Sequence, residues 1–373
     1  MADSLPLLRH FRKLQDPRIN RRKLHSLESV LVIALCAVIA GAEDFQQIAL
    51  FGQKRRAWLE RFLALPNGIP SHDTFERLFA RLNPVVFQEC FASWMNAWHA
   101  KLTGKHLAID GKAVTGSASP AKGLRCLHLV NAWAVEAKLC LGIVVCDADS
   151  NEITAIPPLL ALLDLQGALV SIDAAGCQKK IAEQIVSAGG DYLLTVKGNQ
   201  EKLYEEIEAF FKRQLHNGFT GEGLSRYEKD AEGHGRQEGR FYVVAEDPEG
   251  ISEREDWPSL NVIGMCYSVR KEEDKAEEYN VRYFIGSKKA KARYYGRRMR
   301  GHWGVENNCH WQLDVTFRED QSQVRERTAQ ANLAVVRRLA LNLAKQEETK
   351  MSVAKKRFAA ALDTNYLEEI LNV

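Results

Sequence analysis

Two short apolar segments that each end in an aspartate constrain the fold of this chain more than any other feature. They are Leu107–Asp110 and Ala168–Asp173. Apolar runs this short are typical of buried strands, because a helix normally needs a longer stretch. We therefore expect both aspartates at the ends of strands inside a mixed α/β domain.

A third acid, Glu306, lies in a segment with neither Gly nor Pro after Gly304, so we predict a helix there. Residues four apart share one helix face, which places His302, Glu306 and His310 in a row with Leu313 close beside them. Two carboxylates at strand ends and a third on a helix predict a site for hard divalent cations. Mg²⁺ prefers oxygen ligands and leaves room for water and substrate phosphate, so phosphodiester chemistry is the expected use.

The two histidines that flank Glu306 leave a second interpretation open. His302 and His310 on one helix face, with an acid between them, would also suit Zn²⁺. No cysteine pair and no third histidine lies nearby in the sequence. We therefore favour a magnesium-type site over a zinc site.

Length and composition are typical of a globular protein with more than one structural unit. The chain has 373 residues, of which 46% are hydrophobic and 27% charged. The longest apolar run, Val30–Ala42, is too short to span a bilayer and predicts a buried helix. The N-terminus does not resemble a signal peptide, so we expect a cytoplasmic protein. The eight cysteines are scattered and predict reduced thiols.

One segment is strongly basic although the net charge of the chain is only +3. Seven basic residues and two tyrosines, but no acid, lie between positions 288 and 300. The basic residues are Lys288, Lys289, Lys291, Arg293, Arg297, Arg298 and Arg300. Such a cluster is either a solvated helix face or a contact for the phosphate backbone of nucleic acid. We favour phosphate contact, because the run leads directly into the helix of Glu306.

The N-terminal region, residues 1–103, is predicted to be helical. We expect helices near 27–42, 44–63, 74–82 and 84–102, with Asp73 and Glu76 forming a capping box for the third. Short helices with basic turns occur in helix-turn-helix DNA readers and also in ordinary bundles. This region is therefore a candidate DNA-binding domain, with an ordinary helical bundle as the alternative.

Residues 104–324 are predicted to form a catalytic domain with a β-rich insertion at about 201–287. Three early strands, near 107–110, 126–135 and 138–146, precede alternating helix and strand. The alternating part comprises a helix at 158–165, a strand at 168–173, a helix at 179–188 and a strand at 192–196. This order is that of a ribonuclease-H-like domain, although another mixed α/β fold would also fit. In the insertion we expect strands at 235–245, 261–270 and 279–285, and residues 325–373 are predicted to be a helical tail.

Several motifs, in this order, resemble the DDE transposases of bacterial insertion sequences, in the branch of the H-repeat-associated proteins. The matching segments are Asp16–Arg18, Gly68–Thr74, Ala108–Lys112, Ser150–Pro157, Ile172–Gln178, Val196–Gln200, His234–Arg236, His302–Asn307 and His310–Val315. They extend from near the N-terminus to the Glu306 helix and beyond it, so the resemblance covers nearly the whole chain.

The resemblance implies a bacterial, nucleoid-associated transposase that cleaves transposon ends and transfers the 3′-hydroxyl into target DNA. It assigns Asp110, Asp173 and Glu306 as catalytic residues that hold two Mg²⁺ or Mn²⁺ ions. The implied partners are terminal inverted repeats and target DNA, with a homodimer in the synaptic complex. The residues implied in DNA binding or in support of the site are Lys112, Lys197, Asn199, Arg297, Arg298, Arg300, His302, Asn307 and His310.

Some positions depart from the family pattern. The wider family has an arginine four residues before the glutamate and a lysine seven after it, where this chain has His302 and Leu313. A cation must then come from elsewhere, for example Lys197 or Arg300. Basic residues are also replaced by Thr115 and Asp149. We interpret two tryptophans beside Glu306 as core residues: Trp303 and Trp311.

Two other functions remain open from the sequence. One is a transposase-derived DNA-binding protein without catalysis, and the other is a nuclease of the same fold that cuts but does not join strands. The intact acidic triad argues against the first of these.

Overall fold

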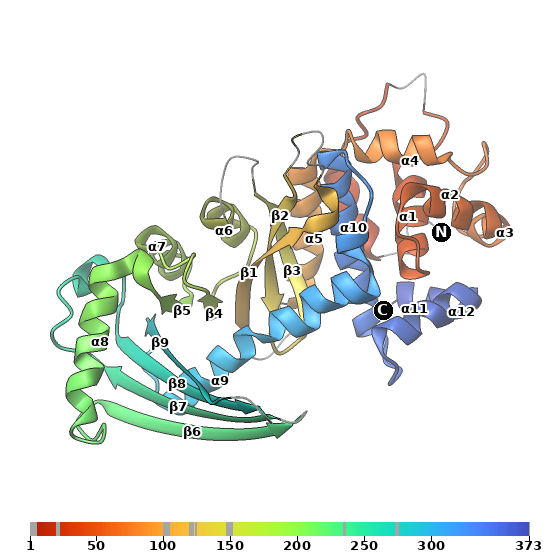
Figure 1. The fold of residues 1–373 in the computed structure, drawn as a ribbon. Helices are drawn as coiled ribbons and strands as arrows, with labels where there is room; N and C mark the ends of the chain where they lie inside the picture. Colours follow the sequence, from red (N-terminus) through yellow and green to blue (C-terminus); the bar gives the residue numbers. More distant parts are fainter. Residues whose placement is uncertain are drawn as a thin grey trace.

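A nine-stranded sheet organises the protein in the computed structural model, which describes residues 6–19, 23–99, 105–118, 123, 125–146, 152–233, 236–272 and 276–372. The strand order is β3-β2-β1-β4-β5-β9-β8-β7-β6 (Figure 1). The first five strands are β1 (His106–Val114), β2 (Leu127–Ala134), β3 (Leu139–Val145), β4 (Leu169–Ile172) and β5 (Asp191–Val196). β1 to β3 are antiparallel, while β4 and β5 run parallel to β1. The prediction of a ribonuclease-H-like domain is confirmed.

Helices cover both faces of this half of the sheet. Successive strand residues point to opposite faces. On one face, Asn131 of β2 accepts a hydrogen bond from Arg338 of α10 (Arg327–Gln346). The next residue, Ala132, points to the other face and pairs with Gly142 of β3. A Cβ on Gly142 would meet side chains at α6 (Glu152–Ala161). α6 and α10 therefore lie on opposite faces. All four residues of β4 are buried, as expected for a parallel strand between two helical layers.

Helix α6 begins at Glu152, six residues before the start predicted at position 158. Pro157 and Pro158 lie inside the helix, although each removes one backbone hydrogen bond. Ala155 and Ile156 are buried against the core. Burial of this apolar face outweighs the local cost of the prolines.

The insertion forms the other half of the same sheet. Its strands are β6 (Leu224–Gly233), β7 (Arg236–Glu246), β8 (Val262–Glu272) and β9 (Glu278–Gly286), an antiparallel meander that joins the sheet through β9 and β5. The three predicted strands correspond to β7, β8 and β9. Strand β6 was missed because it is an edge strand with mostly exposed, polar side chains. Helix α8 (Glu201–Leu215) packs against β8 and β9.

Helix α9 (Ala292–His302) crosses the sheet and contacts β6 and β7 at one end and β1 and β4 at the other (Figure 1). Its approach to β1 depends on Gly301. A Cβ at this position would lie 3.0 Å from Val135 Cγ1 and 3.3 Å from His106 Nδ1. Contacts this short require α9 or these two side chains to move by a few tenths of an ångström, so glycine lets the end of α9 lie close to the sheet.

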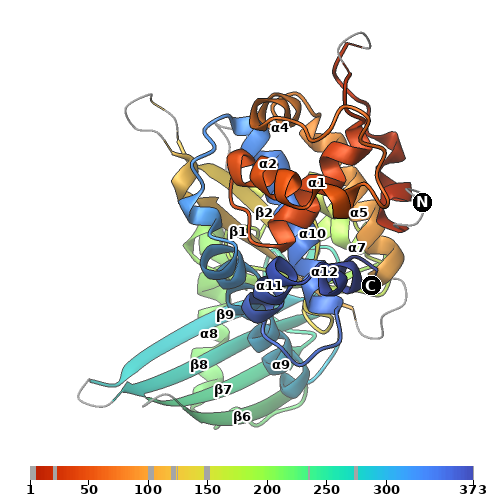
Figure 2. The ribbon, with the colours of Figure 1, turned by 90° about the vertical axis from the view of Figure 1, so that its right-hand side faces the viewer.

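The N-terminal and C-terminal helical regions pack on each other. The N-terminal elements are a 3₁₀ helix (Pro6–Lys13), α1 (Leu27–Ile39), α2 (Phe45–Lys54), α3 (Arg56–Leu59), α4 (His72–Phe79) and α5 (Pro84–His99). The C-terminal elements are α10, α11 (Val353–Leu362) and α12 (Thr364–Leu371). α1, which is buried along most of its length, contacts α10, α11 and α12 (Figure 2). The domain boundaries stay a prediction.

Two details of the N-terminal region differ from expectation. The single helix predicted at 44–63 is divided into α2 and α3 at Arg55. The N-cap of α4 is Ser71, whose side chain accepts a hydrogen bond from the Thr74 backbone N–H, so the prediction of Asp73 as the cap was wrong. Ser is as good an N-cap as Asp, and the chain simply enters the helix two residues earlier. None of the described helices is long and apolar enough to cross a membrane.

Candidate active site

Sheet register brings the two aspartates together. Ile109 of β1 and Ile172 of β4 are direct partners in the parallel ladder. The next residues are Asp110 and Asp173, which therefore lie side by side on the sheet face that α9 crosses. Lys197 follows the end of β5, the neighbouring strand. Asp110 lies inside β1 and not at a strand end as predicted, because β1 continues to Val114 as the partner of β2. Asp173 and Lys197 do follow the ends of β4 and β5, so two acids and one cation gather where the parallel ladder ends.

A pocket of about 500 Å³ contains all three predicted acids. Asp110, Asp173 and Glu306 line it together with Lys197 and His302. Six further lining residues come from the insertion: Glu238, Ser268, Arg270, Glu278, Asn280 and Arg282. The sequence did not reveal these six, because they occupy polar strand positions with no motif of their own.

The segment that carries Glu306 is helical, as predicted, but its turns are π-helical and not α-helical, so residues four apart do not keep one face. α9 ends at His302, and two π-helical segments follow, Glu306–His310 and Gln312–Thr316. The Asn308 side chain donates to the Gly304 carbonyl oxygen at 2.9 Å. In an α-helix, that oxygen would accept from the backbone N–H of Asn308. A competing side-chain donor of this kind loosens the regular ladder. Glu306 is exposed and still lines the pocket with the aspartates.

The electrostatics of the acids favour a bound cation. Burial, followed by the charges of Asp173 and Glu306, raises the pKa of Asp110 to about 7. Close carboxylates that repel one another are stabilised by a divalent ion between them. Within the described part of the chain, no three His, Cys, Asp or Glu side chains are already arranged around a single metal position. The donor set fits Mg²⁺ or Mn²⁺, and the three carboxylates must draw closer to share ions.

A fourth acid, Glu152, lies close to the aspartates and was not singled out from the sequence. A Cβ on Gly111 would come within 1.9 Å of Glu152 Oε1, so the glycine after Asp110 makes room for this carboxylate. Burial and the charge of Asp173 raise the pKa of Glu152. Glu152 adds to the negative potential around Asp110. Its motif neighbours Ser150 and Asn151, as well as Asp149 and His234, lie outside the described residues.

His310 is oriented by a chain of buried hydrogen bonds. Arg338 Nε donates to Asn131 Oδ1 at 2.8 Å, which turns the Asn131 amide nitrogen towards His310 Nε2 at 3.4 Å. Because the amide nitrogen can only donate, His310 Nε2 must accept. Burial, with the nearby Arg338 charge, lowers the pKa of His310 to about 3. The neutral ring therefore carries its proton on Nδ1, which is 3.7 Å from Asp110 Oδ2.

His302 is held by a second chain on the other side of Glu306. His302 Nδ1 and His106 Nε2 each lie 2.8 Å from Ser171 Oγ. His106 Nδ1 is buried without a partner and faces Gly301, so this nitrogen bears no proton and Nε2 donates to Ser171. The Ser171 hydroxyl then donates to His302 Nδ1, since its other acceptor, the Leu107 carbonyl, is 3.5 Å away. This leaves the proton of His302 on Nε2.

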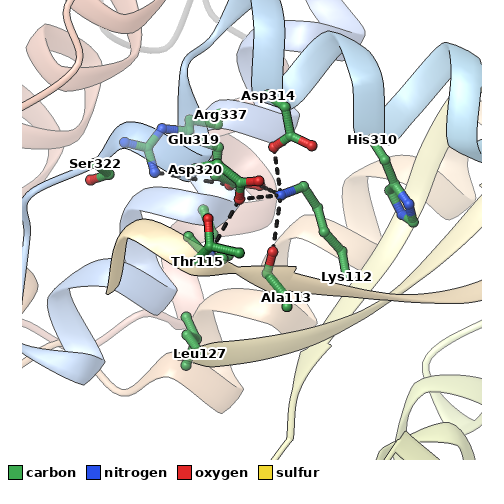
Figure 3. A network of polar contacts seen from close by, with 12 residues as sticks. Lys112, Ala113, Thr115, Leu127, His310, Asp314, Glu319, Asp320, Ser322 and Arg337 are labelled. Atoms are coloured by element: carbon green, nitrogen blue, oxygen red, sulfur yellow. Dashed lines mark hydrogen bonds and ion pairs between the residues drawn. The ribbon is translucent and has the colours of Figure 1, made fainter. Parts of the chain in front are cut away.

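Lys112 is buried in a charged network and does not face solvent (Figure 3). Its ammonium lies 2.6 Å from Asp314, 2.9 Å from Asp320 and 3.7 Å from Glu319. Glu319 is also paired with Arg338 at 2.7 Å. Direct contact of Lys112 with DNA does not fit this geometry, whereas a supporting role does. The network links β1 to the segment after Glu306 and to α10.

The basic cluster is partly neutralised by acids of the sheet. Ion pairs join Lys288 to Asp191, Lys289 to Asp247, Lys291 to Glu246 and Arg298 to Glu136. Within the basic cluster, three exposed arginines have no ion pair among the described residues: Arg293, Arg297 and Arg300. They are three and four residues apart and so lie on one side of α9. Of the arginines predicted to contact DNA, Arg297 and Arg300 remain available to a phosphate backbone, and Arg298 is paired with Glu136.

The remaining candidates lie near the pocket or on the surface. Asn199 Nδ2 donates to the Ala174 carbonyl at 2.8 Å, which holds the turn after Asp173. Asn307 is exposed. The expectation that both tryptophans are core residues was wrong: Trp311 is 51% exposed and Trp303 lines the pocket. Pattern alone could not show this, because the π-helical turns change which residues face the core.

Comparison with known proteins places these residues in a family. Residues 101–343 match the family described as Transposase DDE domain, and residues 8–95 match DDE_Tnp_1-associated. "Putative transposase YncI" of Escherichia coli O157:H7 is 39% identical over 98% of this chain and 94% of its own length. "H repeat-associated putative transposase YhhI" of Escherichia coli K12 is 35% identical over 98% of this chain and 97% of its own.

A solved structure of a piggyBac transposase synaptic complex with hairpin DNA covers 93% of this chain and 73% of its own. Its identity is 11% and its TM-score 0.39. This likeness is too weak to carry an argument about the present site.

Proposed function

The chain belongs to the DDE transposase family, and on that premise we propose that it cuts the ends of a mobile DNA element and joins the freed 3′-hydroxyls to target DNA. The observation that carries this proposal is the pocket shared by Asp110, Asp173 and Glu306. These acids come from β1, from the end of β4 and from the segment after α9, three parts of the chain that only the fold brings together.

Asp110, Asp173 and Glu306 are the residues that would hold two Mg²⁺ or Mn²⁺ ions. When bound, such ions would supply the activation of a water or a 3′-hydroxyl and the stabilisation of the departing oxygen of the phosphodiester. The protein's own part is placement. His310 Nδ1 faces Asp110 at 3.7 Å, Asn199 holds the turn after Asp173, and the Ser171 hydroxyl fixes the ring of His302 beside the pocket.

Phosphate recognition is assigned to cations around the acids. Lys197 lines the pocket, and Arg297 and Arg300 extend the positive surface along α9. A neutral His302 with its proton on Nε2 offers one hydrogen-bond donor where the wider family has an arginine. The N-terminal helices are proposed to add DNA contacts, and a homodimer is proposed for the complex that pairs the two element ends.

A strand-transfer assay tests this function. The substrate is a linear duplex that carries the inverted repeats found in the DNA flanking the gene, incubated with Mg²⁺ or Mn²⁺ and target DNA. Joined products are expected from the wild type. Asp110→Asn is expected to abolish chemistry and to leave DNA binding measurable, because it removes one metal ligand but no phosphate contact. Asp230→Asn, an exposed acid on β6, is the matched control and should react at the wild-type rate.

The same assay separates the rival functions. Cleavage without joining would identify a nuclease of this fold, and binding without either reaction would identify a DNA-binding protein derived from a transposase. If Asp110→Asn cut DNA at the wild-type rate, the catalytic assignment would be wrong.

A further inference from the structure

The cations around the pocket differ in what they contact. The lysine and arginine side chains that line the pocket, and so bring positive charge to it, are Lys197, Arg270 and Arg282. Arg270 lies opposite Glu278 in the register of β8 and β9. Among the residues that the structure describes, Lys197 and Arg282 have no acid within ion-pair distance. Arg282 is thus a guanidinium inside an acidic pocket without a carboxylate partner of its own.

Trp303 holds this guanidinium in place. The Arg282 guanidinium carbon lies 4.3 Å from the centre of the Trp303 ring, and Arg240 and Arg300 approach the same ring at 5.6 and 6.0 Å. Arg240 is already paired with Glu238. Stacking uses the flat face of a guanidinium and leaves its N–H groups free at the edge. Arg282 is therefore oriented but its hydrogen-bond donors are not consumed.

Register places Arg282 on the same sheet face as Asp173 but two residues further along the strands, because Asp173 is level with Thr195 and Phe284. Val196 of β5 pairs with Tyr283 of β9, so the next position along the two antiparallel strands sets Lys197 beside Arg282. β9 is two strands away from β4, which carries Asp173 at its end. Two strand spacings are roughly 10 Å. Arg282 is then too far from the aspartates to share their phosphate and suits a neighbouring one.

We propose that Arg282, held against Trp303, binds a backbone phosphate of the DNA strand next to the phosphodiester that is cut. The inference rests on the proposed function and deepens it. It answers the question raised by Leu313, which is fully buried where the wider family has a lysine: a strand of the insertion supplies the missing positive charge. A guanidinium can grip a phosphate with two parallel hydrogen bonds, which a lysine cannot.

The test measures DNA binding by the full chain without divalent metal, so that no cleavage occurs. The probes are a fluorescein-labelled duplex from the DNA flanking the gene and a random duplex of equal length, each titrated over a series of salt concentrations. Arg282→Met should weaken binding about tenfold. It should also lower the slope of log affinity against log salt by roughly one phosphate contact. Arg282→Lys should keep the slope, because the charge remains, and should lose part of the affinity.

Two further variants separate a DNA contact from a structural role. Trp303→Leu should weaken binding with an unchanged slope, because it removes the platform and leaves the charge. Arg226→Met is the matched control, since Arg226 lies on the outermost strand of the same sheet and donates to the Gly218 carbonyl. It should bind like the wild type. Arg282→Gln repeats the test if the Met variant does not fold.

Methylphosphonate substitution then locates the contact. Each phosphate of the labelled duplex is neutralised in turn, and one position next to the cut should make the wild type and Arg282→Met equally weak. The proposal is overturned if Arg282→Met matches Arg226→Met in affinity and slope, or if no single phosphate removes the difference. Failure of the wild type to bind either duplex would instead overturn the proposed function.

Discussion

At the scale of single residues, His310 is the side chain whose environment defines its role most sharply. Its Nε2 accepts from Asn131, and its Nδ1 faces Asp110. We expect His310→Gln, which can replace only the Nε2 end of the ring, to lose the donor towards Asp110. Loss of such an orienting partner lowers metal affinity by about 10- to 100-fold. Mn²⁺ titration followed by electron paramagnetic resonance measures this without any reaction.

His310→Asn is the matched comparison, because its amide nitrogen falls near the position of Nδ1. It should keep most of the Mn²⁺ affinity. Equal losses in the Gln and Asn variants would mean that the ring is needed only for packing, and wild-type affinity in both would remove His310 from the site.

The role of a residue could be predicted from the sequence where a motif singles it out. It could not be predicted where the role depends on contacts with residues far away in the chain. The motifs singled out Asp110, Asp173 and Glu306, and the structure brings all three to one pocket. Lys112 belongs to the same motif as Asp110, yet its partners lie about two hundred residues further along the chain. Arg282 has no motif at all. Its role depends on β9 pairing with β5 and on the position of Trp303, which are properties of the fold.

At the scale of elements, the close approach of α9 to β1 is a consequence of Gly301. Gly301→Ala introduces a Cβ 3.0 Å from Val135 and 3.3 Å from His106. Overpacking of this kind costs about 1–3 kcal/mol. We expect lower thermal stability and a slower cleavage rate, since the shift of α9 also moves His302 and Glu306. Thermal unfolding and the strand-cleavage rate measure the two effects.

Gly304→Ala provides the control on the neighbouring turn. A Cβ there meets its nearest neighbour, Asn308 Nδ2, at 3.7 Å, which is an ordinary contact. This variant should be as stable as the wild type or slightly more stable. A Gly301→Ala protein with wild-type stability and rate would show that the helix has room to move without consequence.

Periodicity predicted most elements but not their irregularities. The apolar runs located β1, β2, β3 and β4, because these strands are buried and their side chains are therefore mostly apolar. The first π-helical turn after α9 begins where the Asn308 side chain takes the Gly304 carbonyl, which periodicity does not show. The edge strand β6 has little apolar pattern to detect. In each case the deciding interaction is either a single hydrogen bond or a tertiary contact.

At the scale of the whole molecule, Glu319 joins three parts of the fold through Arg338 and Lys112. Burial alone would raise the pKa of Glu319, but the charges of Arg338 and Lys112 lower it to about 2. A carboxyl with a lowered pKa stabilises the folded state above its unfolded pKa, near 4.3. That contribution is lost as the pH falls from about 4 towards 2.

Glu319→Gln should therefore flatten the acid dependence of stability in this pH window. It should also destabilise the protein at neutral pH by about 3–5 kcal/mol, because Arg338 stays buried without its partner. Unfolding at pH 7 and at several acidic values measures both effects. Glu60→Gln, which removes an exposed ion pair with Arg56, should change stability by less than about 1 kcal/mol. Equal behaviour of the two variants would contradict the role of Glu319.

We propose that Asp110, Asp173 and Glu306, contributed by distant parts of the chain, together hold the divalent ions needed to cut DNA. The most direct measurement is anomalous diffraction from crystals of the protein with DNA and Mn²⁺. We expect anomalous peaks within coordination distance of all three carboxylates, and their loss in Asp173→Asn. Mn²⁺ bound away from these acids in a complex that still cleaves DNA, or peaks unchanged in the variant, would contradict it.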